Sequence, residues 1–328
     1  MFKALQLSKQ GDVFSASLVQ VDPDGLPPGD VQVQVQYSTL NYKDALAITN
    51  SASVVRLWPM VAGIDGAGVV LSSEHGDWQP GDHFIHNGWG LGETRWGMLA
   101  ERASVQGQWM VKLPAGLSCR QAMAIGTAGY TAMLCVMALQ EHGLHPGDGE
   151  VLVTGAAGGV GSIAVAVLVK LGYTVVASTG RLSESDYLKS LGATTIMDRN
   201  ELASPSKPLG KERWAAVVDT VGSHTLANAC ATTRWDGAVA ACGLAQGMDF
   251  PATVAPFILR GVTLYGINSV TTPRPKREMV WQRLAKDLPM DKLDAMIQEI
   301  SLTRALTIAP EILAGQVRGR LVVNVNQL

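Results

Sequence analysis

The stretch Val151-Leu152-Val153-Thr154-Gly155-Ala156-Ala157-Gly158-Gly159-Val160-Gly161 decides the fold class of this chain. Its first four residues form an uncharged, mainly β-branched run that is typical of a central strand in a parallel sheet. Residues 162–171 continue as a largely apolar helix. The three spaced glycines allow a tight turn and a close approach of the backbone to a pyrophosphate. The pattern predicts a dinucleotide site, and a turn with glycines for packing alone is the alternative.

Strands and helices alternate on the C-terminal side of this turn. The expected strands are Glu150–Thr154, Thr174–Ser178, Thr195–Met197, Ala215–Thr220, Ala238–Ala241 and Val262–Ile267. Helices are expected at Val160–Leu171, Glu184–Leu191 and Thr225–Thr232. Such alternation predicts a doubly wound parallel sheet with helices on both faces. We therefore expect a Rossmann domain over residues 125–270.

The first 120 residues indicate strands without intervening helices. Val31–Tyr37 alternates apolar and polar residues, as a half-buried strand does. Further short strands are expected in Met60–Leu71, His83–His86 and Val105–Leu113. A helix at about Arg277–Lys286 and a late strand, Arg320–Asn324, follow the Rossmann part, and this strand is expected to return to the β-rich part. The predicted fold class is α/β, with a β-rich catalytic domain formed by residues 1–124 and 271–328.

Composition excludes several classes of protein. With 328 residues, 47% of them hydrophobic and 16% charged, the chain is globular rather than disordered. A formal net charge of −2 argues against a nucleic-acid binder. The four cysteines include no C-x-x-C pair, and the first residues lack the apolar core of a signal peptide, so a cytoplasmic location is expected. The uncharged stretches 121–140 and 151–169 contain glycines and polar residues, so no membrane span is expected.

The second expected strand of the Rossmann domain bears on the choice of cofactor. It runs into Ser178-Thr179-Gly180-Arg181, which lacks the acidic residue that binds the ribose 2′-hydroxyl of NAD. Two hydroxyls, a glycine and a guanidinium can instead surround a 2′-phosphate. Arg199, after the third strand, is expected to close the same pocket. NADPH is therefore the expected cofactor.

Four contiguous motifs resemble a known family: Asn41–Leu46, Pro59–Asp65, Gly126–Ala132 and Asp219–Gly222. From end to end, the chain resembles the quinone-oxidoreductase branch of the medium-chain dehydrogenase/reductase superfamily. More narrowly, it is similar to the YhdH/AcuI group of NADPH-dependent acrylyl-CoA reductases. The resemblance implies a GroES-like catalytic domain, a Rossmann domain and a cleft between them. It also implies reduction of the carbon–carbon double bond of acrylyl-CoA to give propionyl-CoA.

The resemblance carries site residues over by motif. The implied cofactor contacts are Tyr42, Ala157, Gly158, Gly159, Val160, Ser178, Thr179, Gly180, Arg181, Arg199, Leu244, Ile267 and Asn324. Tyr42, assisted by Asn41, is the expected catalytic donor to the thioester oxygen, and aromatic packing beneath the cofactor is the alternative role of Tyr42. Either Tyr42 or water protonates the α-carbon.

The sequence predicts that no metal is bound. Where zinc-dependent relatives place a cysteine, this chain has Asn41-Tyr42, and where they place Gly-His-Glu it has Gly63-Ile64-Asp65. A catalytic zinc needs three protein ligands. His83 and His86 lack a third ligand nearby in the sequence and are interpreted as structural or surface residues.

Three further features leave alternatives open. Trp89, Trp96 and the glycines of Gly88–Gly92 are expected in a loop at the mouth of the cleft or in ordinary loop packing. Cations suited to the phosphates of CoA are Arg260, Arg274, Lys276 and Arg277, although residues 274–277 also fit a solvated loop. Pairing of the last strand, 262–267, with its copy predicts a homodimer.

The substrate is a small molecule in each enzymatic interpretation. The first alternative function is a quinone or enone reductase without a CoA requirement. The second is a non-catalytic NADPH-sensing protein. The retained glycine turn and the polar Asn41-Tyr42 pair favour an enzyme over the sensor.

Overall fold

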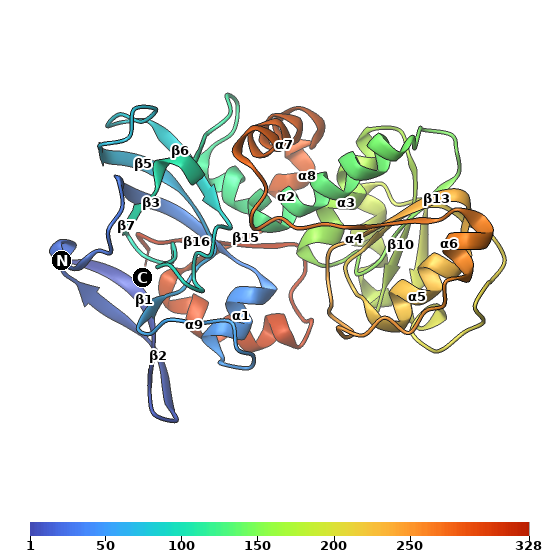
Figure 1. The fold of residues 1–328 in the computed structure, drawn as a ribbon. Helices are drawn as coiled ribbons and strands as arrows, with labels where there is room; N and C mark the ends of the chain where they lie inside the picture. Colours follow the sequence, from blue (N-terminus) through green and yellow to red (C-terminus); the bar gives the residue numbers. More distant parts are fainter. Residues whose placement is uncertain (328) are drawn as a thin grey trace. The chain divides into compact units, whose positions relative to one another are not determined.

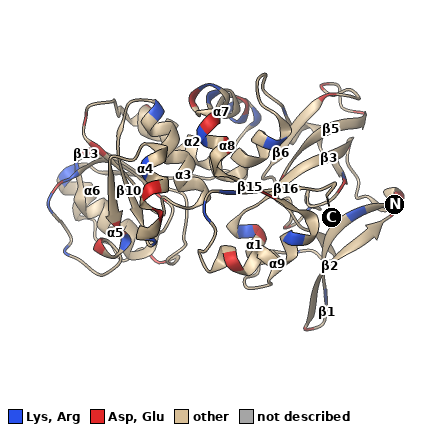
Figure 2. Ribbon diagram, turned by 180° about the vertical axis from the view of Figure 1, so that it is seen from behind, with Lys and Arg blue, Asp and Glu red and all other residues tan. Residues whose placement is uncertain are grey.

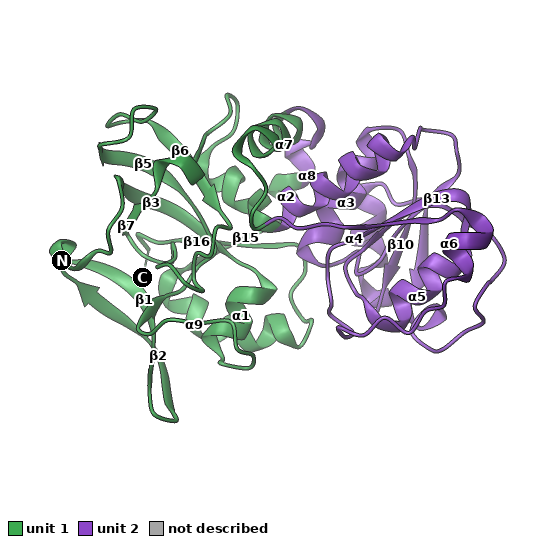
Figure 3. Ribbon diagram, viewed as in Figure 1, with its two compact units in different colours: residues 1–127, 270–285, 293–328 green, residues 128–269, 286–292 purple. Residues whose placement is uncertain are grey.

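The computed structural model describes residues 1–327, which form two compact units (Figure 3). Unit 1 comprises Met1–Thr127, Val270–Ala285 and the described part of Leu293–Leu328. Unit 2 comprises Ala128–Ser269 and Lys286–Lys292. Leu328, the last residue of the predicted catalytic domain, lies outside the described residues.

Unit 2 contains a six-stranded sheet in the order β11-β10-β9-β12-β13-β14, with all five neighbouring pairs parallel. Helices lie on both sides of this sheet (Figure 1), which confirms the predicted doubly wound architecture. The strands are β9 (Glu150–Val153), β10 (Thr174–Thr179), β11 (Thr195–Asp198), β12 (Trp214–Asp219), β13 (Thr233–Ala241) and β14 (Thr263–Gly266). The helices are α3 (Gly159–Lys170), α4 (Ser185–Leu191), α5 (Ser223–Thr232) and α6 (Ala255–Arg260).

The strand order fixes where unit 2 can bind a ligand. From β9 the chain first adds β10 and β11 on one side, and then returns to place β12, β13 and β14 on the other. The reversal point lies between β9 and β12. In open α/β sheets, ligands bind beyond the carboxyl ends of the strands at this point.

Unit 1 is built mainly from antiparallel strands. A seven-stranded sheet has the order β15-β16-β3-β5-β6-β8, with β7 also paired to β3, and a smaller sheet has the order β2-β1-β4. The strands are β1 (Phe2–Gln10), β2 (Val13–Val21), β3 (Val31–Leu40), β4 (Met60–Val61), β5 (Asp65–Ser73), β6 (His83–Asn87), β7 (Arg102–Val105), β8 (Val111–Lys112), β15 (Ile297–Ser301) and β16 (Arg320–Asn324). β16 pairs antiparallel with β3, so the late strand returns to the β-rich part as predicted.

Two predictions about unit 1 were wrong. Residues 105–113 do not form one strand, because β7 ends at Val105 and a 3₁₀ turn intervenes at Gly107–Trp109. The backbone of Gly107 forms hydrogen bonds with side chains instead of with a neighbouring strand. Its N–H donates to the carboxylate of Asp30 (2.7 Å), and its carbonyl accepts from the indole of Trp78 (2.9 Å). The strands are also interrupted by a helix, α1 (Tyr42–Ile48), whose seven residues are too few to show a helical period.

Four helices complete the fold: α2 (Cys119–His142), α7 (Arg274–Asp287), α8 (Met290–Met296) and α9 (Leu302–Leu313). α9 was not predicted. Ser301 caps it by accepting from the N–H of Arg304 (3.3 Å), and Leu302, Ala305, Ile308 and Ala309 form its buried face. α2 is long and apolar enough to cross a membrane, but 89% of its most apolar window is buried inside the protein. It is therefore accounted for as a core helix.

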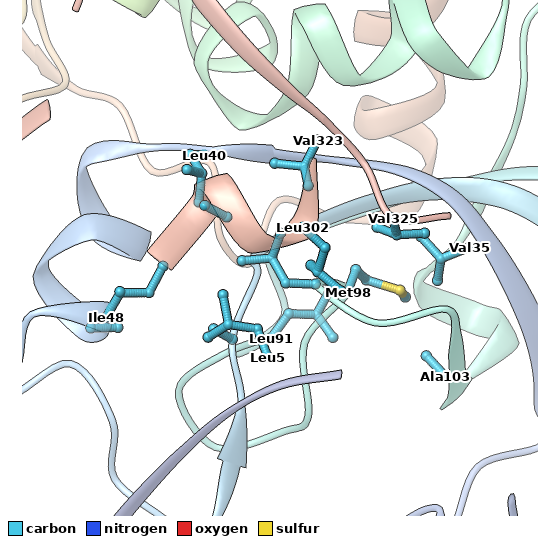
Figure 4. Packing of buried hydrophobic residues seen from close by; sticks show 14 of the residues in the cluster. Leu5, Val35, Leu40, Ile48, Leu91, Met98, Ala103, Leu302, Val323 and Val325 are labelled. Carbon is cyan, nitrogen blue, oxygen red and sulfur yellow. The ribbon is translucent and has the colours of Figure 1, made fainter. Parts of the chain in front are cut away.

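Each unit has a hydrophobic core of its own. In unit 1, Leu5, Leu91, Met98 and Leu302 gather with side chains from β3 and β16 (Figure 4). The alternation of β3 explains its part in this core, since Val31, Val33 and Val35 are buried while Gln32 and Gln34 are exposed. A second cluster, around Leu152, Val217 and Val239, fills unit 2. Charged residues of both signs are scattered along the ribbon, and α7 carries both (Figure 2).

Candidate functional site

The glycine turn after β9 has backbone geometry that only glycine accommodates. Gly155 has a φ of +59°, and a Cβ at this position would lie 2.2 Å from Thr220 Oγ1. A Cβ on Gly161 would lie 2.4 Å from the carbonyl oxygen of Gly155. Gly158 precedes α3, so Ala157–Val160 form the turn and the first residues of that helix. The first N–H groups of a helix lack intrahelical acceptors, which makes this turn a cradle for an anion.

Next to this turn, a buried carboxylate links the ends of β9 and β12, the two strands between which the strand order reverses. Asp219, at the end of β12, accepts from the Thr154 hydroxyl (2.7 Å) and from the Gly222 N–H (2.8 Å). The Thr154 hydroxyl also accepts from the Thr220 N–H (3.0 Å). Burial raises the pKa of Asp219, and the donors around it oppose that rise. Asp219 thereby joins the ends of β9 and β12, a role that the motif Asp219–Gly222 did not indicate in the sequence.

The residues after β10 lie beside the glycine turn. The N–H of Ala156 donates to the carbonyl of Ser178 (3.0 Å). The Ser178 hydroxyl is buried and has no hydrogen-bond partner among residues 1–327. Thr179 is buried as well, and its hydroxyl accepts from the N–H of Arg181 (3.1 Å). This edge therefore offers hydroxyl groups next to the anion cradle.

Two arginines border Gly180. Arg181 is half-buried and lies 3.8 Å from a carboxylate oxygen of Glu184. Arg199, directly after β11, is exposed, and its Nε would lie 2.6 Å from a Cβ on Gly180. Unit 2 thus brings Arg199 against Gly180, although the two residues are 19 positions apart in the sequence. A glycine at 180 leaves the space that the guanidinium fills.

Leu244 and Ile267 follow the carboxyl ends of β13 and β14, at the same edge of the sheet as the glycine turn. Leu244 is 51% exposed. The N–H of Ile267 donates to the carbonyl of Ala241 (2.9 Å). Asn324 belongs to β16 in unit 1, where its amide donates to Glu299 (3.2 Å), so its cofactor contact stays a prediction.

In unit 1, Asn41 is the centre of a buried polar network. Its side-chain nitrogen donates to Asp44 Oδ2 (3.1 Å) and to Asp65 Oδ2 (2.7 Å). Its side-chain oxygen accepts from Arg320 Nη2 (3.3 Å). Both amide hydrogens are thereby committed to carboxylates. Sequence reasoning predicted Asn41 as a donor and missed Asp44, Asp65 and Arg320.

The two carboxylates of this network are fully buried. Burial, followed by the nearby charge of Asp65, raises the pKa of Asp44 to about 7, although the Asn41 and Ile64 donors oppose the rise. Burial also raises the pKa of Asp65, opposed by the donors of Thr127 and Asn41 and by the Arg320 charge. The Asp44–Asp65 pair therefore holds protons more tightly than ordinary carboxyl groups do.

The network reaches a break in α2. Gly126 has a φ of +49° and a ψ of −161°, which interrupts the helix. The following residue, Thr127, donates to Asp65 through both its N–H (3.0 Å) and its hydroxyl (2.6 Å). Arg320 donates to the carbonyl of Ala124 (2.6 Å) on the other side of the break. The buried polar groups thus fix the main chain where α2 bends.

Tyr42 begins α1 directly after Asn41. Its side chain is 43% exposed, and its hydroxyl makes no hydrogen bond within residues 1–327. The phenol is therefore available to a ligand, whereas the amide beside it is occupied by the protein.

Three of the four cations predicted for the phosphates of CoA are committed elsewhere. Arg260 donates to the carbonyls of Ala231 (2.9 Å) and Gly210 (2.6 Å). Arg274 pairs with Asp77 (2.7 Å) and Glu278 (2.8 Å). Arg277 is fully buried and donates to the carbonyl of Asn87 (2.9 Å). Main-chain carbonyls hold Arg260 and Arg277, and carboxylates hold Arg274, so a contact of these side chains with the phosphates of CoA stays a prediction.

Metal ligands do not gather in the part of the chain that the structure describes. Among residues 1–327, no group of three or more His, Cys, Asp or Glu side chains is placed to hold an ion. His83 is exposed and His86 is fully buried. The prediction that no metal is bound remains a prediction.

Comparisons with known families match both parts of the chain. Residues 27–115 match the alcohol dehydrogenase GroES-like domain, and residues 159–286 match the zinc-binding dehydrogenase family. The chain is 52% identical to the probable acrylyl-CoA reductase AcuI of Escherichia coli (strain K12), over 99% of this chain and all of that protein. It is 51% identical to the acrylyl-CoA reductase AcuI of Ruegeria pomeroyi, with the same coverage.

Solved structures agree with this similarity. The yhdH oxidoreductase of Salmonella enterica, in complex with NADP, superposes with a TM-score of 0.97 at 52% identity, over 98% of this chain and 99% of that chain. The yhfP protein of Bacillus subtilis, with NAD bound, has a TM-score of 0.94 at 44% identity, over 98% and 99% of the two chains. These matches confirm the predicted GroES-like and Rossmann fold class. The chain belongs to the medium-chain dehydrogenase/reductase superfamily, in the group that contains the YhdH and AcuI proteins.

Proposed function

We propose that this chain is an NADPH-dependent reductase that converts the carbon–carbon double bond of an α,β-unsaturated acyl thioester, acrylyl-CoA, to the saturated product propionyl-CoA. The observation that carries the proposal is the end-to-end similarity to acrylyl-CoA reductases, at 51% and 52% identity. Since the similarity leaves no large segment unmatched, the whole catalytic unit is shared and not the cofactor domain alone.

Residues of unit 2 fit a dinucleotide. A Cβ at Gly155 or at Gly161 would overlap with neighbouring atoms, so the backbone of this turn can approach a ligand closely. The turn leads into the N-terminus of α3, whose first N–H groups are free to bind a pyrophosphate. The unpartnered Ser178 hydroxyl lies at the adjacent strand end. Arg181 and Arg199, on the two sides of Gly180, are the cations that we assign to the 2′-phosphate of NADPH.

The relative from Bacillus subtilis was solved with NAD, so the choice between the two cofactors needs its own test. We expect kcat/KM to be at least tenfold higher with NADPH than with NADH, because two arginines stabilise the 2′-phosphate that only NADPH carries. A preference for NADH would overturn the assignment of Arg181 and Arg199.

Two neighbouring residues of unit 1, Asn41 and Tyr42, have roles in the proposed reaction. NADPH supplies the hydride when it is bound, and the β-carbon of the substrate accepts it while negative charge develops on the thioester oxygen. A proton from Tyr42 or from water then adds to the α-carbon and gives the saturated product. The free hydroxyl of Tyr42 donates a hydrogen bond to that oxygen. Asn41 is a positioning residue, because its amide hydrogens already bind Asp44 and Asp65.

The experiment that tests the function follows the loss of NADPH absorbance with acrylyl-CoA and with a simple benzoquinone as acceptors. We expect turnover with acrylyl-CoA and propionyl-CoA as the product identified by mass spectrometry. Equal turnover with the quinone would favour a general quinone reductase. Tight NADPH binding without turnover of any acceptor would favour the NADPH-sensing alternative.

We further propose which residues form each domain, and that the protein is a homodimer. Residues 125–270 form the NADPH-binding domain, and residues 1–124 with 271–328 form the catalytic domain. β14 is an edge strand, and the neighbouring helix α6 exposes Ile258 (73%) and Leu259 (65%), which supports a homodimer through this edge. Light scattering at micromolar concentration should give twice the 34.7 kDa chain mass, and a monomeric mass would reject the dimer.

The cysteines support a cytoplasmic location. All four are free thiols, and three of them are buried. Free thiols without a disulfide partner are typical of reducing compartments. Fractionation of cells that produce the protein tests this location, and recovery outside the cytoplasm would contradict it.

A further inference from the structure

Unit 1 contains a pocket of about 520 Å³ that the proposed reaction does not use. Its walls are formed by residues 91–96, by the end of β7 and the 3₁₀ turn that follows it, and by apolar residues such as Pro28, Leu57 and Pro59. Neither the glycine turn nor the Asn41 network is part of it. The volume is within the range of small-molecule sites, and the lining combines aromatic surface with a few polar groups.

His86 gives this pocket an unusual polar group. The side chain lines the pocket and is 1% exposed, yet neither ring nitrogen has a hydrogen-bond partner within residues 1–327. Burial, together with the charges of Arg277 and Arg95, lowers the pKa of His86 to about 3. The ring is therefore neutral near pH 7 and offers one donor and one acceptor. A buried polar group without a partner is costly unless a ligand satisfies it.

Aromatic rings and guanidinium groups stack beside His86. Trp89 and Trp109 lie parallel, with centroids 5.7 Å apart and an interplanar angle of 13°. The guanidinium of Arg95 lies 4.3 Å from the centroid of Trp109, and that of Arg277 lies 5.6 Å from the centroid of Trp89. Trp96 adds a further aromatic wall to the pocket.

Arg95 differs from the arginines that were expected to bind phosphate. Arg274 and Arg260 pair with carboxylates, whereas Arg95 forms no ion pair within the described residues. One of its terminal nitrogens donates to the carbonyl of Trp89 (3.0 Å), which holds the guanidinium at the pocket. An exposed, oriented guanidinium without a carboxylate is suited to a phosphate.

We propose that this pocket binds the adenine nucleotide end of the CoA substrate, with the purine against the aromatic wall and His86, and a phosphate at Arg95. This inference rests on the proposed function. The edge of a purine carries both donor and acceptor atoms, so it can form a hydrogen bond with either nitrogen of a neutral imidazole, and its flat ring stacks on indole and guanidinium planes. The acyl group and the flexible pantetheine arm offer neither a planar ring nor the nucleotide phosphates.

The test compares two thioesters at saturating NADPH: acrylyl-CoA and acrylyl-pantetheine, which lacks the nucleotide. We expect Arg95→Ala to raise the KM for acrylyl-CoA about tenfold and to leave the KM for acrylyl-pantetheine unchanged. Arg102→Ala, which changes an exposed arginine on β7 outside the pocket lining, is the matched control and should alter neither KM. Unchanged KM values for both thioesters in Arg95→Ala would overturn the inference.

A second variant separates binding from folding. His86→Leu removes a buried polar group that has no partner in the protein, so we expect an unchanged or higher Tm together with a higher KM for acrylyl-CoA alone. A lower Tm with equal effects on both thioesters would assign His86 a structural role and contradict the proposal.

A direct binding measurement tests the pocket assignment separately from the proposed reaction. Calorimetry with adenosine 3′,5′-bisphosphate, in the presence of saturating NADPH to fill the dinucleotide site, should detect binding to the wild type that Arg95→Ala weakens about tenfold. Equal binding to both proteins, or no binding, would reject the pocket assignment. Binding without turnover of any thioester would instead reject the proposed reaction and retain the pocket.

Discussion

Replacing Gly126 by alanine tests whether the break in α2 is held by the polar network of unit 1. The residue has a φ of +49° and a ψ of −161°, a region that is nearly exclusive to glycine. An added Cβ would lie 2.9 Å from Arg320 Nη2, 2.9 Å from Thr39 Cγ2 and 3.0 Å from Asp65 Oδ2. Backbone strain and overlap with three groups therefore act together.

The two contributions can be estimated separately. The backbone conformation costs a residue with a Cβ about 1–3 kcal/mol. Overpacking of a filled interior costs about 1–3 kcal/mol more. We expect Gly126→Ala to lower the free energy of unfolding of unit 1 by about 4 kcal/mol, which is a large share of the stability of an ordinary domain.

Urea unfolding followed by tryptophan fluorescence measures this loss, because six of the eight tryptophans belong to unit 1. Gly116→Ala is the control for backbone strain alone, because Gly116 has a φ of +88° but a Cβ there would meet nothing within 4 Å. This substitution should lower the free energy of unfolding by about 1–2 kcal/mol. Gly25→Ala, with open space and no left-handed φ, should change stability by less than about 0.5 kcal/mol. A loss at Gly126 no larger than that at Gly116 would refute the idea that packing of the network holds the break.

Three further predictions concern the site. Tyr42→Phe should lower kcat about 10²–10³-fold at saturating NADPH without weakening NADPH binding; turnover at the wild-type rate would remove the hydroxyl from the mechanism. Arg181→Ala and Arg199→Ala should each weaken NADPH binding about tenfold in fluorescence titrations and leave NADH binding nearly unchanged, and an equal loss for both cofactors would contradict a 2′-phosphate contact. Because burial and Asp65 raise the pKa of Asp44 to about 7 from 3.8, the folded chain binds more protons than the unfolded chain between these values, and the stability from this carboxyl falls as pH rises from about 4 to about 7. Asp44→Asn should flatten this part of the pH dependence in urea unfolding, and parallel curves for the two proteins would exclude Asp44 as its source.

The sequence predicted the parts of this protein that depend on local pattern. The glycine turn, the strands around it and the existence of the late strand Arg320–Asn324 were readable, because strand periodicity and turn chemistry are properties of short segments. The return of this strand to the β-rich part was expected as well, but its pairing with β3 was not. The polar network was not, since Asp65 binds Thr127 across 62 positions and Arg320 binds Asn41 across 279. Burial was equally hidden: nothing near His86 or Arg277 in the sequence indicates that these polar side chains lie in the interior.

The buried network also accounts for the choice of asparagine at position 41. Two buried carboxylates next to each other would be strongly unfavourable if they lacked donors. The amide of Asn41 supplies one hydrogen to each of Asp44 and Asp65 and accepts from Arg320 with its oxygen, so a single neutral side chain joins three ionisable groups. An aspartate at this position would add a third carboxylate and remove both hydrogens. Because Tyr42 follows Asn41 and begins α1, the same hydrogen bonds hold the main chain from which the Tyr42 side chain extends.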